Sequence, residues 1–129
     1  MPSEIVNPSG VHEPIGRSYS HARKAGNTIY VAGQVALDVE GNLVGKGDIV
    51  AQTDQVFTNL QAVLAAAGTS FSDVAKLTTY LTSREDLPGF REGRQRHFTG
   101  DPPANTLLIV SGLASPDFLL EIEAVAVVD

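Results

Sequence analysis

The sequence contains no cysteine and no tryptophan among its 129 residues. Without cysteine, the chain cannot form a disulfide bond, bind a metal through thiolate or use a thiol as a nucleophile. No apolar run approaches the roughly 20 residues that a membrane-spanning helix needs. The N-terminal stretch MPSEIVNPSGVHEPIG lacks the basic and apolar segments of a secretory signal. We therefore expect a cytoplasmic protein with no membrane partner.

Positive charge is scarce as well. Nine Lys and Arg residues stand against 15 Asp and Glu residues, which gives a formal net charge of −6. The basic residues are spread over the chain, whereas nucleic-acid-binding proteins concentrate them on one face. No nucleic acid partner is therefore expected. His12, His21 and His97 are far apart in the sequence and have no metal-ligand spacing, and no HExxH, P-loop or GxGxxG motif is present.

The chain has the composition and length of one globular domain spanning residues 1–129. Apolar residues make up 43% of it, which is enough for a single hydrophobic core. Alternating and β-branched patterns predict strands at Glu4–Val6, Tyr19–Ala25, Thr28–Leu37, Val74–Ser83, Asn105–Val110 and Phe118–Val128.

The second of the longer strands contains a glycine, Gly33, which predicts a bulge or a close backbone approach at that point. Strict alternation would place Ile29, Val31 and Gly33 on one face, and Tyr30, Ala32 and Gln34 on the other.

Apolar residues at three- and four-residue spacing predict a first helix that Asp48 caps and Gly68 ends. We expect Gln52, Asp54, Gln55 and Asn59 to cover its polar side. A second helix is expected after an Asp86 cap, with Pro88 in its first turn. The order of elements predicts an α+β fold with both helices on one face of a single sheet.

The last strand is apolar on both faces, with Val125 and Val127 on one side and Ala124, Ala126 and Val128 on the other. Such strands are normally covered on both faces. Because two helices can cover only one face, we expect an oligomer to close the second.

Three segments together resemble the Rid family, also called the YjgF/YER057c/UK114 family. They are YVAGQVALD, QTDQVFTNLQAVLAAAGTSFSDVAKLTTYLT and EIEAVAV, and the resemblance extends from about residue 19 to residue 127. It implies a chorismate-mutase-like α+β fold and a homotrimer with a barrel-like core and ligand clefts between subunits. It further implies hydrolysis of reactive enamines and imines to keto acids and ammonia, without a metal or an organic cofactor.

Some positions keep the residues that the resemblance assigns to the site. Tyr19 matches the site tyrosine, Gly33 the cleft-lining glycine, and Glu121 the carboxylate that positions or activates water. A general base and a hydrogen-bond donor are the groups that imine hydrolysis requires.

Other positions depart from the family pattern. Asn105 stands where active deaminases carry the arginine that clamps the substrate carboxylate. Leu107 replaces a frequent cysteine, Ala32 replaces a frequent serine, and Arg91 falls on a helix asparagine. Either the substrate is neutral or larger and hydrogen-bonds to Asn105, or another cation, Arg91 or Arg94, has taken over the clamp.

Plainer interpretations stay open beside these. Asn105 can be a strand-entry residue, Tyr19 can pack a strand edge, and Glu121 can be solvated like Glu123, which shares its face. His97 fits a surface or interface role better than acid–base catalysis.

For function, the leading hypothesis is a cofactor-free enamine or imine deaminase, and the alternative is a non-catalytic small-molecule-binding or chaperone-like trimer. Ribonuclease activity is disfavoured because no basic groove or histidine pair is apparent.

Overall fold

A computed structural model describes residues 3–129 of the chain. The helices and strands are β1 (Glu4–Val6), β2 (Ala22–Ala25), β3 (Thr28–Gln34), α1 (Ile49–Ala66), β4 (Val74–Leu81), α2 (Leu87–Gln95), β5 (Ala104–Ile109) and β6 (Leu120–Val127). Short 3-10 turns lie at Ile15–Arg17, Phe71–Asp73 and Arg84–Asp86.

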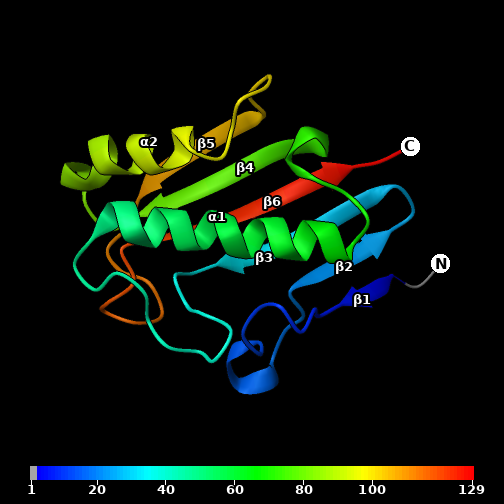
Figure 1. Cartoon of the computed structure of the whole chain (residues 1–129), viewed down its shortest axis with the longest axis horizontal. Coiled ribbons are helices and arrows are strands. Elements are labelled where there is room, and N and C mark those ends of the chain that lie inside the picture. Colours follow the sequence, from blue (N-terminus) through cyan, green and yellow to red (C-terminus); the bar gives the residue numbers. More distant parts are fainter. Residues whose placement is uncertain (1–2) are drawn as a thin grey trace.

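The six strands form one mixed sheet in the order β1-β2-β3-β6-β4-β5. Only β4 and β5 are parallel, and α2 makes the crossover between them. Both helices lie on the same face of the sheet (Figure 1). The expected α+β fold is confirmed. The strand that was expected to begin at Tyr19 begins at Ala22, so Tyr19 lies in the preceding loop.

Helix α1 begins and ends where the sequence indicates. The Asp48 side chain accepts a hydrogen bond from the Ala51 amide at 3.1 Å, and Gly68 takes a positive φ of 86° after the last turn. The apolar stripe is fully buried: Val56, Phe57, Leu60, Val63 and Leu64 are all 0% exposed.

Of the four α1 residues expected on the polar side, Gln52 and Asn59 are buried. The Gln52 amide donates to the carbonyls of Gly45 and Asp117 at 3.1 and 2.9 Å, and its oxygen accepts from the Leu119 amide at 2.9 Å. Asn59 donates to the carbonyls of Val35 and Leu37. These side chains are buried because they satisfy backbone groups of two loops that would otherwise lack partners.

The prediction that Asp86 caps α2 is wrong, since the Asp86 side chain makes no hydrogen bond to the first turn of the helix. The Ser83 hydroxyl instead accepts from the Glu85 amide and starts the short turn before the helix. Pro88 does lie in the first turn. Gly93 lets the two helices approach closely, because a Cβ there would come within 2.7 Å of Thr53 Cγ2.

Strand β3 contains the expected irregularity. Its register with β6 shifts between Val31 and Gln34, at the position of Gly33. The shift turns Gln34 to the helix-covered face, where it is 0% exposed, so strict alternation is wrong beyond the bulge.

Within residues 3–129, no helix covers the opposite face of the sheet. On β6, Ile122, Ala124 and Ala126 are buried beneath the helices, whereas Val127 on the opposite face is 48% exposed. Tyr30 of β3 is 53% exposed on that same face. We call this the open face; it mixes apolar and polar side chains.

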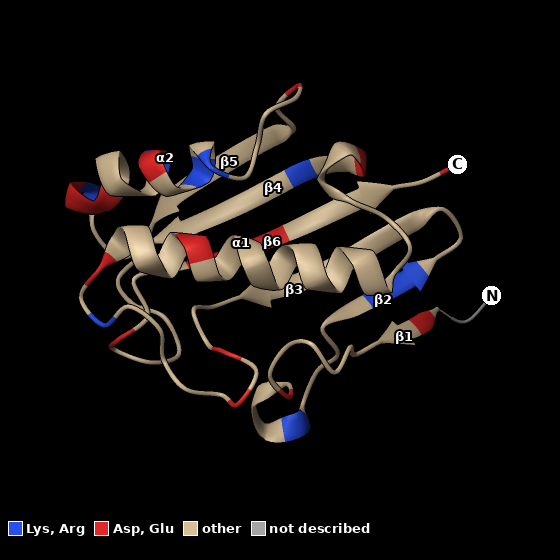
Figure 2. Cartoon of the chain, in the orientation of Figure 1, with Lys and Arg blue, Asp and Glu red and all other residues tan. Residues whose placement is uncertain are grey.

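Charged residues are spread over the helices, strands and loops rather than gathered in one segment (Figure 2). The absence of a nucleic acid partner stays a prediction. Within residues 3–129, no helix combines the length and the apolar character that crossing a membrane requires.

Candidate functional site

A cavity of about 360 Å³ lies between the loop before β2, the bulge of β3 and the start of β6. Four of the residues singled out in the sequence line it: Tyr19, Ala32, Gly33 and Glu121. Ile15, Val35 and Phe118 contribute much of its apolar wall. A mostly apolar cavity with a few polar groups is the usual form of a small-molecule site.

Glu121 and Gly33 lie against each other across β6 and β3. A Cβ at residue 33 would collide with Glu121 Oε2 and would lie 2.7 Å from its Cδ. The missing side chain therefore leaves the space that the carboxylate occupies, and the β3 bulge brings this backbone close to β6.

The buried α1 side chains position this carboxylate. Gln52 binds the backbone on both sides of Phe118, just before β6 begins. Asn59 binds the carbonyl of Val35, which lines the cavity one residue beyond β3. The two walls are thus attached to one rigid helix.

The Glu121 carboxyl group is half-buried. Burial raises its pKa above the usual range, and the nearby charge of Glu123 raises this pKa further. A carboxyl group with a raised pKa can carry a proton closer to neutral pH and can exchange it with a substrate.

Glu123 has a different environment from Glu121. The Tyr80 hydroxyl of β4 donates a hydrogen bond to Glu123 Oε1, and this bond raises the pKa of Tyr80 above its usual range. Tyr80 therefore remains a protonated donor at neutral pH.

Tyr19 lies at the cavity wall, where its hydroxyl oxygen accepts a hydrogen bond from the Ile15 amide at 3.2 Å. This contact uses an acceptor position and leaves the hydroxyl proton free to be donated. Placing Tyr19 in a loop rather than on a strand brings its ring to the cavity.

Two histidines that are separated in the sequence come together behind the site. The rings of His12 and His21 are 4.9 Å apart, and both side chains are buried. His21 Nε2 lies 2.7 Å from the His12 carbonyl, and its Nδ1 lies 3.1 Å from the Gln34 amide nitrogen. Burial, the largest influence, lowers the pKa of His21 and so favours the neutral ring. No sequence motif indicated this contact between the two histidines.

Within residues 3–129, no cluster of three His, Cys, Asp or Glu residues could hold a metal ion. A larger cavity, of about 730 Å³, adjoins the first and shares Tyr19 with it. We place the candidate site in the smaller cavity because Glu121 lines it, whereas the acidic residue of the larger one, Glu13, is an exposed residue paired with Arg17.

The remaining sequence candidates lie elsewhere. Asn105 is exposed on the edge strand β5, where its Oδ1 is 3.4 Å from the Thr79 hydroxyl. Leu107 faces the same way and packs against the core, and Arg91 is exposed on α2. None of these three lines the cavity. One chain therefore does not bring them to Glu121.

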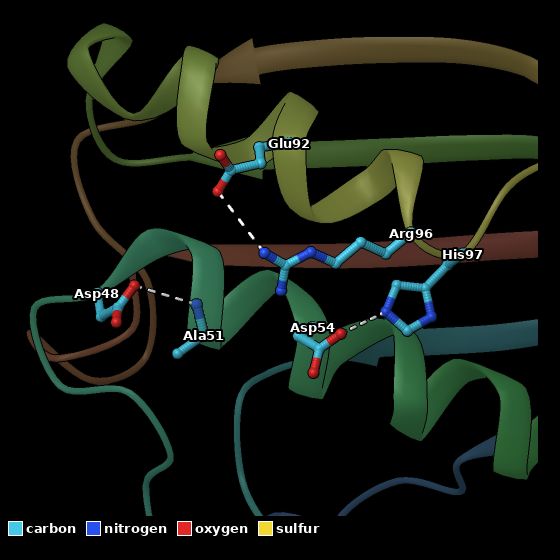
Figure 3. A network of polar contacts seen from close by, with 6 residues as sticks. All are labelled: Asp48, Ala51, Asp54, Glu92, Arg96 and His97. Atoms are coloured by element: carbon cyan, nitrogen blue, oxygen red, sulfur yellow. Dashed lines mark hydrogen bonds and ion pairs between the residues drawn. The ribbon is translucent and has the colours of Figure 1, made fainter.

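The two proposed replacement cations are not at the cavity either. The Arg94 guanidinium lies over the Phe98 ring, 5.4 Å from its centre. Nearby, His97 Nε2 contacts Asp54 Oδ1 at 2.7 Å, and Arg96 pairs with Glu92 at 3.8 Å (Figure 3). The His97–Asp54 contact connects α1 with the residues after α2, which gives His97 a structural role, whereas the Arg96–Glu92 pair lies at the end of α2 itself.

Comparisons with known proteins agree with this picture. The model of the family described as Endoribonuclease L-PSP matches residues 12–128. A RutC family protein of Pyrococcus horikoshii is 42% identical over 123 residues, covering 95% of this chain and 96% of the relative.

Two further relatives have names that state an activity. The 3-aminoacrylate deaminase RutC of Acinetobacter baylyi is 37% identical, with 98% of each chain covered. A 2-iminobutanoate/2-iminopropanoate deaminase of Dermatophagoides farinae is 32% identical, covering 99% of this chain and 98% of the relative. Among solved structures, RidA from an Antarctic Psychrobacter matches with a TM-score of 0.90 and 31% identity, over 97% of this chain and 99% of that one.

Proposed function

The chain belongs to the Endoribonuclease L-PSP family, and on this premise we propose that it is a cofactor-free hydrolase that deaminates a reactive enamine or imine. The observation that carries the proposal is the half-buried Glu121 carboxylate, lying against Gly33 in a cavity that also holds the Tyr19 hydroxyl. Relatives named as deaminases of 3-aminoacrylate and of 2-imino acids support the reaction class.

The chemistry needs water, an acid–base group and a hydrogen-bond donor. An enamine first tautomerises to its imine. Water then adds to the imine carbon: a C–O bond forms, and the electron pair of the C=N π bond moves to nitrogen. Glu121 accepts a proton from this water and delivers it to nitrogen. The resulting carbinolamine breaks its C–N bond, its hydroxyl proton is transferred to the leaving nitrogen, and a carbonyl compound and ammonia are released.

Tyr19 and the apolar wall have supporting roles in this scheme. The free proton of the Tyr19 hydroxyl hydrogen-bonds to the substrate as charge develops on it. Ala32 and Gly33 present a small, uncharged surface beside Glu121, so the substrate can approach the carboxylate closely.

The substrate differs from the small 2-imino acids. Asn105 offers an amide and no charge, and no Lys or Arg lines the cavity in the described part of the chain. Asn105 suits a substrate group that hydrogen-bonds without needing a cation, such as a neutral carbonyl or amide.

Asn105, Leu107 and Arg91 reach a substrate only if a second copy of the chain lies against the first. We propose a homotrimer in which the open face is covered and the ligand binds in a cleft between subunits. The exposed apolar side chains of Tyr30 and Val127 on the open face support this arrangement.

One observation favours a second candidate function, a small-molecule-binding or chaperone-like trimer without turnover. Asn105 removes the charged anchor on which catalysis of small imino acids depends, and such a change would leave a binding cleft in place. In either case we expect no RNA cleavage, because the charge is net negative and the basic residues are spread.

The test is the decay of freshly generated 2-iminopropionate and of a neutral imine, followed by absorbance. We expect turnover of the neutral imine by the parent and loss of roughly 100-fold or more in Glu121→Gln, as for other positioned acid–base groups. Glu40→Gln, in an exposed turn, is the matched control and should match the parent. Equal rates for parent and Glu121→Gln would contradict the enzymatic proposal and favour the binding function.

A further inference from the structure

Two carboxylates on one face of β6 have opposite surroundings, and we propose that this asymmetry makes Glu121 the residue that carries the site's proton. Tyr80 and Glu123 act as positioning residues that keep the proton on Glu121. The proposal rests on the proposed function for its chemical meaning, but its central claim concerns the protonation of this chain alone.

The asymmetry arises from the geometry of two adjacent strands. Glu121 and Glu123 are two residues apart on β6, so both face away from the helices. On antiparallel β4, Tyr80 is directly opposite Glu121, and Thr78 is opposite Glu123. Nevertheless the Tyr80 hydroxyl reaches diagonally and donates to Glu123. Tyr80, the donor directly opposite Glu121, thus donates its hydrogen bond to Glu123 instead.

This hydrogen bond stabilises the ionised form of Glu123, because an O–H donor favours the charged carboxylate. Glu121 receives no such donor among the described residues and lies in an apolar-walled cavity against Gly33. Burial and the charge of Glu123 act in the same direction on Glu121, and both raise its pKa. A carboxyl group that is buried beside a second carboxylate holds its proton to a higher pH than an isolated, solvated one does.

Among the described residues, Glu123 is the charged group that shifts the pKa of Glu121, and no cation offsets its effect. Lys76 of β4 faces the open side, but its ammonium group donates to the Thr106 hydroxyl at 2.6 Å, on the far side of β4 from β6. From the loop before β2, Tyr19 faces the cavity. From β3, the lining residues are Ala32 and Gly33, which carry no charge.

If Glu121 holds the proton, the same hydrolysis begins one proton transfer earlier, with Glu121 as an acid. It gives its proton to the imine nitrogen, and its carboxylate then takes a proton from water as the C–O bond forms. Glu121 returns that proton to nitrogen as the C–N bond breaks, and it recovers a proton from the hydroxyl that becomes the carbonyl. The residue ends the cycle as it began, and one water is consumed for each ammonia released.

The test is an NMR pH titration of ¹³C-glutamate-labelled protein, with the Glu121 signal assigned from its absence in Glu121→Gln. In the parent, Glu121 should titrate above the usual range of a glutamate side chain. Glu123→Gln and Tyr80→Phe should each move the Glu121 midpoint to lower pH, on the order of one pH unit for removal of the neighbouring charge. Tyr30→Phe removes a hydroxyl from the same face without touching either carboxylate and should leave the midpoint unchanged.

A Glu121 midpoint that stays fixed in both variants, or a parent in which Glu121 titrates within the usual glutamate range, would overturn the proposal. Sedimentation of each variant verifies that its assembly matches the parent's. The titration does not depend on turnover, so the two proposals fail separately. An inert parent with the expected titration rejects the deaminase only, whereas an active parent with unshifted midpoints rejects the proton assignment only.

Discussion

The carboxylate of Glu121 occupies the space that a side chain at Gly33 would fill. This relationship joins the β3 bulge, visible in the sequence as a glycine within a strand, to a carboxylate that lines the cavity.

Gly33→Ala should therefore impair the site more than the fold. The added methyl group would push the Glu121 carboxylate out of position, and misplacement by about 1 Å can cost on the order of 100-fold in rate. The measurement is kcat for imine hydrolysis with the thermal midpoint measured in parallel. Gly112→Ala is the matched control, because a Cβ there meets nothing within 4 Å. Equal activity of the two variants would contradict this prediction.

The open face should hold the assembly together. Val127→Asp places a charge at a half-exposed apolar position on that face, and burying an unpaired charge costs several kcal/mol. We expect the subunits to associate roughly 100-fold more weakly or worse, as measured by sedimentation over a range of concentrations. Val39→Asp, in an exposed loop, should leave the assembly intact. A parent that sediments as a monomer would refute the homotrimer.

Gln52 should be the polar residue of α1 on which stability depends most. Gln52→Ala leaves the carbonyls of Gly45 and Asp117 and the amide of Leu119 without their partner. Unpaired buried polar groups cost about 1–3 kcal/mol each, and we expect a total loss of roughly 2–4 kcal/mol in urea unfolding. Gln61→Ala, exposed on the same helix, should change stability by less than about 0.5 kcal/mol. Similar losses in both variants would show that these bonds contribute little.

The fold follows from local patterns that the sequence displays. The Asp48 cap, the apolar stripe of α1 and the alternation along β6 each depend on neighbours within a few residues. The burial of Gln52 was not predictable in the same way, because its partner Leu119 is 67 residues away. A polar residue looks solvent-facing until the distant backbone that it binds is known.

The site residues likewise fall into those that contacts within one chain bring to the cavity and those that it leaves outside. Gly33 and Glu121 could be identified from a resemblance, and a cross-strand contact brings them together. Asn105 and Arg91 could be identified too, yet one chain leaves them outside the cavity. The diagonal bond from Tyr80 to Glu123 had no sequence signal, since direct pairing places Tyr80 opposite Glu121.

His21 should make stability fall in mild acid. Burial lowers the pKa of His21 below its ordinary value of 6.5. Just below pH 6.5, the histidine therefore binds a proton in the unfolded chain but not in the folded chain. The folded state has its full stability with respect to His21 above pH 6.5, and it loses stability as the pH falls from 6.5 toward the lowered pKa of the folded state. His21→Gln should flatten this part of the profile in urea unfolding. Parallel curves for parent and variant across this window would contradict the assignment.

Asn105 should act as the switch between substrate classes. Restoring the cation with Asn105→Arg should raise kcat/KM for 2-iminopropionate by roughly 30- to 3,000-fold, because a charge-assisted pair in a desolvated cleft is worth about 2–5 kcal/mol. The neutral imine gains no charged partner and should not improve. Asn105→Gln keeps an amide without charge and should resemble the parent for both substrates. If the parent already turns over 2-iminopropionate rapidly and the arginine adds nothing, a cation from elsewhere already serves the cleft, and Arg91→Ala would then have to lower that rate.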